Sequence, residues 1–167
     1  MVDVQPDHAF ISSDRVITIR RYGPVFAGVY YQGLTETSLR EVLEWQRGVI
    51  PDEKIISFSL AFAAELLEPD VKDAADRLLR EFAAQTRASA TVLSAAGFQA
   101  AAARAMLATI YLLVRSTYPR KAFSTVSDAE TWLMEQADEG GGSIYAAARW
   151  LLDEESNVAG ARQARPG

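Results

Sequence analysis

The stretch that most constrains the fold of this sequence is residues 89–136, where two β-rich segments alternate with two helical ones. Residues 90–93 are apolar and bounded by serines, which is typical of a parallel strand buried on both sides. A helical pattern with almost no charge follows over 98–115, then a strand over 122–126 and the capping-box sequence SDAE at 127–130. This alternation predicts an α/β domain whose sheet is covered by helices.

The N-terminal part of the chain indicates an antiparallel hairpin. Residues 16–19 alternate apolar and polar side chains, and residues 25–32 (VFAGVYYQ) are rich in residues that favour strands. Gly23 and Pro24 lie between them and are typical turn residues. We expect a further short strand over 8–12 at the start of the sheet.

A helix, a strand and a second helix follow the hairpin. The first helix is capped by Thr35, Thr37 or Ser38. Residues 55–61 (IISFSLA) alternate as in a strand with one deeply buried side, and the second helix begins at Pro69. Together these elements predict a mixed sheet of four to six strands, with the antiparallel hairpin at its N-terminal side and helices packed on it.

The C-terminal residues read as an addition to this domain, which we place at 1–138. Glycines dominate 139–143 and predict a flexible linker. Residues 144–155 have amphipathic helical spacing and predict an appended helix, while 156–167 are rich in Ala, Gly and Arg and predict a disordered tail. A tethered helix of this kind docks either in a groove of its own domain or on a partner.

The composition excludes several kinds of chemistry. The sequence has no cysteine and a single histidine, His8. Disulfides, thiolate chemistry and most metal sites are therefore excluded, and we expect no cofactor and no metal. His8 has no accompanying nucleophile and is interpreted as a surface residue. A net charge of −5 repels a phosphate backbone, so we expect no nucleic-acid partner.

Two features bear on localisation. The longest apolar run, 97–114, carries Arg104 in its middle, which favours a buried helix over a membrane span. The N-terminal residues MVDVQPDH have neither the positive charge nor the apolar core of a secretion signal. We therefore expect a cytoplasmic protein without a membrane span.

The order of elements resembles the STAS domain, also called the anti-sigma-factor-antagonist or SpoIIAA-like domain. The residues that carry the resemblance are the strand at 90–93, the small-residue helix around 101–106, Pro119, the strand at 122–126, and SDAE ahead of Trp132 and Leu133. The resemblance covers roughly residues 16–136 and implies a bacterial partner-switching or scaffolding module.

One part of the sequence departs from that family. The resemblance implies a phosphorylated serine or threonine in an Asp-Ser-Ser-Gly-like turn between the third strand and the second helix. The equivalent residues, 57–65, read SFSLAFAAE and lack this motif, and Ser57 and Ser59 fall on the predicted strand. The resemblance therefore implies a module without the phosphoacceptor.

Two sets of residues are candidate binding groups. Backbone N–H groups at a helix start can hold an anion, so Ser94 and Gly97 form the candidate small-ligand site. Small side chains allow close helix contact and aromatic side chains favour interfaces, in this chain or with a second subunit. The candidate partner contacts are Tyr30, Tyr31, Ala101, Ala105, Trp150 and Leu151.

These observations predict a non-enzymatic regulatory module that binds another protein or a second copy of itself. The alternative is a carrier or sensor of a small apolar or nucleotide-like ligand, which a large apolar pocket between the 98–115 helix and the sheet would favour. An enzyme would require carboxylates or serines that meet only in space.

Overall fold

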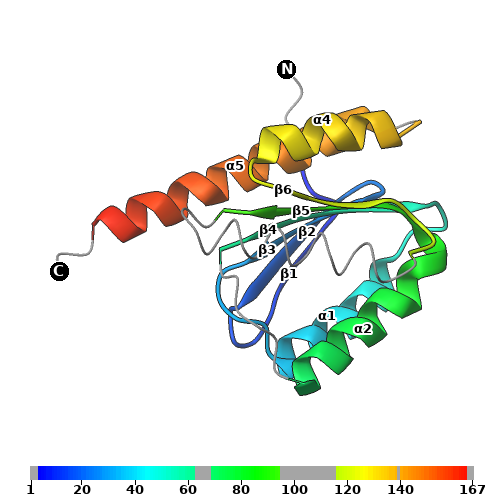
Figure 1. Ribbon diagram of the computed structural model, residues 1–167, viewed down its shortest axis with the longest axis horizontal. Helices are drawn as coiled ribbons and strands as arrows, with labels where there is room; N and C mark the ends of the chain where they lie inside the picture. Colours follow the sequence, from blue (N-terminus) through cyan, green and yellow to red (C-terminus); the bar gives the residue numbers. More distant parts are fainter. Residues whose placement is uncertain (1–3, 63–68, 95–115, 139, 165–167) are drawn as a thin grey trace.

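The protein is built on one six-stranded mixed sheet whose strands lie in the order of the chain (Figure 1). The computed structural model describes residues 4–62, 69–94, 116–138 and 140–164. Strands β1 to β3 pair antiparallel, and β3 to β6 pair parallel. The strands are β1 His8–Ile11, β2 Ile17–Tyr22, β3 Val25–Tyr30, β4 Ile55–Ala61, β5 Thr86–Leu93 and β6 Arg120–Phe123. The predicted mixed α/β sheet with an N-terminal antiparallel hairpin is thereby confirmed.

Helices cover both faces of this sheet (Figure 1). On one face lie α1 Glu36–Val49 and α2 Pro69–Phe82, and on the other lie α4 Val126–Gln136 and α5 Gly141–Gln163. The helix expected over 98–115 lies outside the described residues, and so do Gly97, Ala101 and Ala105.

The two faces of the sheet differ in chemistry because the strand sequences alternate. In β4, Ile56, Phe58 and Leu60 point to the α4–α5 side and are at most 2% exposed. Ser57 and Ser59 point to the α1–α2 side. The larger apolar core therefore lies under α4 and α5, while the opposite face carries hydroxyl groups at the centre of the sheet.

Threonine side chains cap α1 and α4. Thr35 is one of the three residues predicted to cap α1, and its hydroxyl accepts a hydrogen bond from the Ser38 N–H at 3.0 Å. In α4 the cap is Thr125, which accepts from the Asp128 N–H at 3.2 Å. The predicted capping box beginning at Ser127 is wrong, because β6 ends early enough for the helix to start at Val126. Thr125 and Asp128 have the same spacing as the predicted box, shifted toward the N-terminus.

Thr125→Ala is expected to lower the free energy of unfolding by about 1 kcal/mol, because it removes the hydroxyl that caps α4. The matched control is Ser127→Ala, which changes an exposed residue in the first turn and should alter stability by less than about 0.5 kcal/mol. Urea denaturation of both variants checks this, and an equal or larger loss for Ser127→Ala would contradict the assignment.

The C-terminal helix differs most from the prediction. α5 runs over Gly141–Gln163 without a break, so the predicted 139–143 linker, 144–155 helix and 156–167 tail are not separate segments in the described residues. Its residues Ile144, Ala147, Ala148 and Leu151 are at most 1% exposed and belong to the main core.

The physical reason is the pairing of that apolar stripe with the sheet. α5 packs on β2, β3 and α4, and burial of the stripe offsets the poor helix propensity of the glycines. Gly140 has φ +96°, a conformation that favours glycine, and sets the direction in which the helix leaves the preceding loop. A side chain at Gly141 would press on Met134, whose Cε would lie 3.3 Å from the added Cβ.

Candidate functional site

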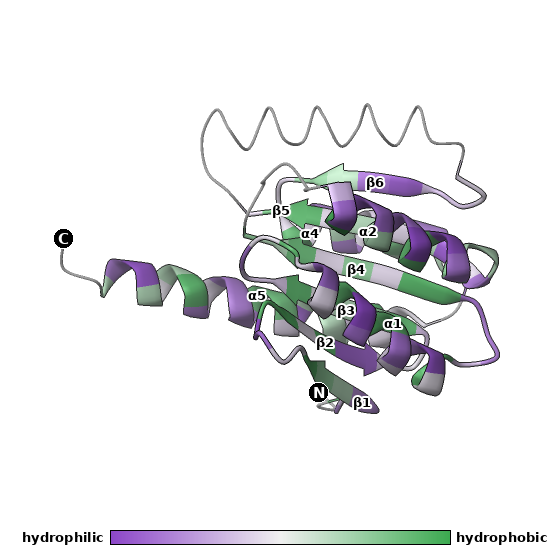
Figure 2. Cartoon of the chain, turned by 90° about the horizontal axis from the view of Figure 1, so that it is seen from below, coloured by the Kyte–Doolittle hydropathy of each residue, from purple (hydrophilic) through white to green (hydrophobic). Residues whose placement is uncertain are grey.

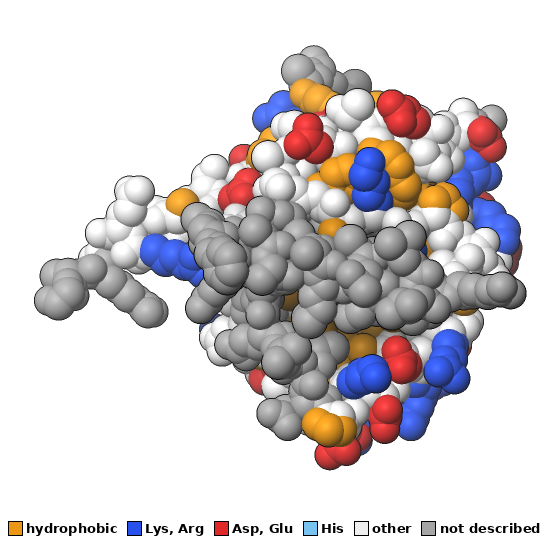
Figure 3. All heavy atoms as spheres, viewed as in Figure 1, with side chains coloured by type: hydrophobic (Ala, Val, Ile, Leu, Met, Phe, Trp, Pro, Cys, Tyr) orange, Lys and Arg blue, Asp and Glu red, His pale blue; other side chains and the backbone are white. Residues whose placement is uncertain are grey.

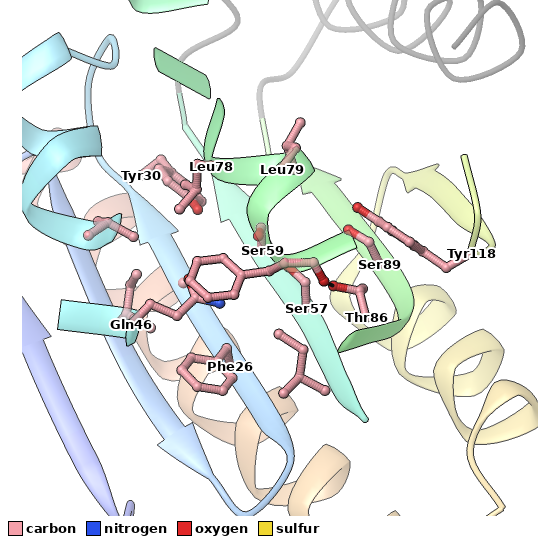
Figure 4. A pocket seen from close by; sticks show the side chains of 15 residues that line it. Phe26, Tyr30, Gln46, Ser57, Ser59, Leu78, Leu79, Thr86, Ser89 and Tyr118 are labelled. Atoms are coloured by element: carbon pink, nitrogen blue, oxygen red, sulfur yellow. Dashed lines mark hydrogen bonds between the residues drawn. The ribbon is translucent and has the colours of Figure 1, made fainter. Parts of the chain in front are cut away.

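A cleft of about 100 Å³ opens on the α1–α2 face of the sheet (Figure 4). Its floor is formed by strand residues with small side chains, namely Gly28, Ser57, Ser59 and Ser89. Apolar and aromatic side chains from α1, α2 and the neighbouring strands form its walls, and Tyr118 closes one side. Ser57 and Ser59 lie on a strand, as the sequence predicts, and their hydroxyls are part of this floor.

The cleft suits small neutral groups. None of its described lining residues carries a charge, so the polarity that they give the cleft comes from hydroxyls and from the Gln46 amide. One of those hydroxyls, on Thr86, already donates to the Phe82 carbonyl at 2.8 Å. Pockets for drug-sized ligands measure roughly 300–1,000 Å³, so the described cleft is too small for a nucleotide.

A second site lies where β3, β4 and β5 end. Each of these parallel strands is followed there by a side chain that contacts α5, and we call this group, Tyr31, Phe62 and Ser94, the carboxyl-end cluster. The Tyr31 hydroxyl donates to Glu154 Oε2 at 2.6 Å, and the Ser94 hydroxyl donates to Glu155 Oε1 at 2.5 Å.

Aromatic contacts complete this arrangement. The rings of Tyr31 and Phe62 stack with their centroids 6.1 Å apart. The guanidinium carbon of Arg162 lies 5.9 Å from the centre of the Phe62 ring, within the range of a cation–π interaction. α5 is thus tied to the ends of three adjacent strands.

Burial raises the pKa of the Tyr31 phenol to about 12, and its hydrogen bond to Glu154 and the negative charge of that carboxylate act in the same direction. Because the pKa is raised in the folded state, the contribution of Tyr31 to stability is complete below its ordinary value of 10.0. That contribution is lost as the pH rises toward 12.

This gives a prediction for Tyr31→Phe. The wild type should be more stable than the variant by a constant amount below about pH 10, and the difference should shrink by roughly 1–2 kcal/mol toward pH 12, allowing for the partial exposure of the phenol. Chemical denaturation across this pH range measures it. A difference that stays constant up to pH 12 would show that Tyr31 does not hold a raised pKa.

Of the two predicted ligand-site residues, Ser94 and Gly97, the structure describes only Ser94. The Ser94 hydroxyl donates to Glu155 Oε1, so in this structure it is already engaged by a carboxylate of the same chain. Gly97 lies outside the described residues. The small-ligand site predicted at Ser94 and Gly97 therefore stays a prediction, and the described structure adds that the Ser94 hydroxyl binds a carboxylate of α5.

The predicted partner contacts separate into three groups. Tyr31 belongs to the carboxyl-end cluster, while Tyr30 lines the cleft on the other face of the sheet. Trp150 and Leu151 are buried in the core of this chain, at 5% and 0% exposure, and present no surface to a partner. Their helix was expected to dock either in a groove of its own domain or on a partner, and in the structure it packs on its own domain.

Sequence reasoning missed Phe62, Glu154, Glu155 and Arg162. A signal for Phe62 exists, since side chains that follow parallel strands gather at one edge of the sheet. The glutamates give no local signal, because their hydrogen-bond partners lie 123 and 61 positions away in the chain.

Three further observations concern other kinds of site. Within the described ranges, no group of three or more His, Asp or Glu side chains is placed to hold a metal ion, and His8 is exposed on β1. No helix in the described part of the chain combines the length and apolarity that a bilayer crossing needs. Lys, Arg, Asp and Glu side chains are interspersed on the face seen in Figure 3.

Comparison with known proteins concerns the fold. No family model and no curated protein matches the sequence. Among solved structures, the chain is similar to the crystal structure of an uncharacterized protein of the DUF3478 family from Shewanella loihica PV-4, which is described as having a SpoIIAA-like fold. The identity is 18% and the TM-score 0.48, over 77% of this chain and 98% of that chain. A SpoIIAA-like fold is also what the sequence predicted.

Proposed function

We propose that this protein is a non-enzymatic regulatory domain that acts by binding another polypeptide. The observation that carries the proposal is the division of α5 into two parts. Residues 141–151, the proximal half, supply the buried stripe of the core. Residues 152–163, the distal half, run past the ends of the strands in both Figure 1 and Figure 2.

The distal half is exposed along most of its length. Of its residues only Glu154, Glu155 and Val158 are half-buried, and the rest are exposed. Among the described residues, its hydrogen bonds to the body of the protein are the two hydroxyl–carboxylate contacts, and such bonds to charged groups contribute about 1.5–3 kcal/mol each. An exposed helical segment that few contacts hold to its own domain is available to a partner, and helices are a common element in such recognition.

Native mass spectrometry of the full-length protein, purified gently from its own host, tests the proposal. We expect the protein in a complex of fixed stoichiometry, either with a second polypeptide or with another copy of itself. A protein found only as an unmodified monomer, across a range of mild ionic strengths, would contradict it.

A second function, the carriage or sensing of a small molecule, is favoured by one observation. The cleft places three serine side chains, Ser57, Ser59 and Ser89, beside apolar walls, which is the usual composition of a small-molecule site. In the same mass spectra this function would appear as an additional small non-covalent mass. The volume of the cleft restricts such a ligand to a small neutral compound, or to the neutral end of a larger one.

A further inference from the structure

The distal half of α5 lies on the carboxyl-end cluster as an internal ligand would. We propose that this cluster is a binding seat for an acidic helical segment of a partner protein, and that the distal half of α5 occupies the seat until the partner's helix replaces it. The proposal rests on the proposed function, since it names the partner chemistry and the regulation of that association.

The geometry of the seat matches two consecutive carboxylates on a helix. Consecutive helical residues point about 100° apart around the helix axis, so the carboxylates of Glu154 and Glu155 diverge to either side. Their donors, Tyr31 and Ser94, follow β3 and β5, two strands that are separated by β4 and therefore lie about 10 Å apart. Each carboxylate accepts a hydrogen bond from one hydroxyl, so the seat binds both carboxylates at the same time.

The middle strand supplies the third contact. Phe62 follows β4 and is 7% exposed, so its ring is a fixed surface between the two hydroxyls. Arg162 lies over this ring, about two helical turns beyond Glu154. The seat therefore recognises two adjacent acidic residues followed two turns later by an arginine.

The hydrogen-bond donors of the seat suit carboxylates. Within the described residues, neither Glu154 nor Glu155 forms a salt bridge, and both are met by neutral hydroxyl donors. Arg20, whose guanidinium lies 4.8 Å from the Trp150 ring, acts on Tyr31 as a nearby positive charge. A carboxylate that enters the seat from another protein would gain the same interactions.

The internal occupant is built to be exchanged. The proximal half of α5 buries four side chains to 1% exposure or less, whereas the only apolar side chain that the distal half buries in part is Val158. Gly160 further weakens the distal half as a helix. Because the distal half is covalently attached, it acts at a high effective concentration and blocks weak external ligands.

Fluorescence anisotropy with a labelled peptide of residues 152–163 tests the seat. The receptors are the full-length wild type, the double variant Glu154→Gln/Glu155→Gln, and the matched control Asp153→Asn, which changes an exposed acidic residue without a contact in the seat. We expect the double variant to bind the peptide at least about ten-fold more tightly than the wild type or the control, because its own helix no longer fills the seat.

Two comparisons show whether binding uses the proposed contacts. A peptide in which both glutamates are replaced by glutamine should bind the double variant at least about ten-fold more weakly than the acidic peptide. Adding Tyr31→Phe and Ser94→Ala to the double variant should also lower affinity for the acidic peptide to the wild-type level. Circular dichroism confirms that each receptor is folded, and the single variants Glu154→Gln and Glu155→Gln replace any that is not.

The outcomes separate this proposal from the proposed function. Equal binding of the acidic and amide peptides, or equal binding by the wild type and the double variant, would overturn the seat. If that occurs while native mass spectra still show a protein partner, the interaction function stands without the seat. If the peptide binds as expected but no polypeptide accompanies the purified protein, the seat stands and the proposed function fails.

Discussion

Replacing Leu151 with alanine is expected to lower the free energy of unfolding by about 2–5 kcal/mol. Leu151 is fully buried where α5 packs on the sheet, and its removal would leave a cavity that the surrounding side chains fill only in part. A loss of this size is what distinguishes a core helix from an appended one, since truncation of a detached helix would leave the domain's stability unchanged.

The adjacent Leu152 provides the control. It is the same residue type on the same helix, but it is 39% exposed. Leu152→Ala should therefore change stability by less than about 1 kcal/mol. Guanidinium denaturation of the two variants gives the comparison directly. Similar values for both would mean that α5 does not dock as described.

Trp150→Ala is expected to cost about 3–5 kcal/mol, because the indole is almost fully buried and the Arg20 guanidinium lies over it. If Trp150 instead served as a partner contact, as the sequence suggested, the change would weaken association and leave the isolated chain as stable as before. Thermal unfolding of the variant, read beside native mass spectra, separates the two cases.

Trp150→Phe refines this test. Among the described residues the buried indole Nε1 has no hydrogen-bond partner, so phenylalanine removes an unsatisfied donor together with part of the ring. We expect a loss of about 1 kcal/mol, well below that of alanine. A phenylalanine variant as unstable as the alanine variant would indicate that the indole N–H has a partner that matters.

Local patterns were enough to predict most elements of the sheet layer. The strand at β4 was predicted with its observed ends, and a helix was predicted where the structure describes α2. The alternation in IISFSLA and the spacing of apolar residues in α2 involve only neighbouring residues, so they can be recognised in a single sequence. β5 and α4 each start earlier than expected, because β5 pairs with β4 from Thr86 onward and α4 is capped by Thr125.

The behaviour of α5 could not be predicted in the same way. A run of glycines is typical of a linker, and nothing within 139–143 indicates that a helix starts there. The deciding interactions are long-range, between Ile144 or Leu151 and residues of the sheet far earlier in the chain. Whether an amphipathic helix docks in its own domain depends on the shape of the groove, which the sequence does not display.

The candidate site was predicted in part. Tyr31 and Ser94 were named for separate reasons, as an interface aromatic and as an anion-binding serine, and the parallel topology brings them to one edge of the sheet. Tyr31 and Ser94 bind adjacent glutamates only because α5 lies at these strand ends. The sequence does not indicate that position of α5.

Amide hydrogen exchange of the full-length protein, followed by mass spectrometry, tests most directly the claim that α5 consists of an anchored half and a releasable half. We predict that amides in 141–151 exchange only with global unfolding. Those in 152–163 should exchange orders of magnitude faster, and Glu154→Gln/Glu155→Gln should accelerate them without affecting the proximal half. Uniform protection along the whole of α5, or a distal half that does not respond to the double variant, would contradict the account.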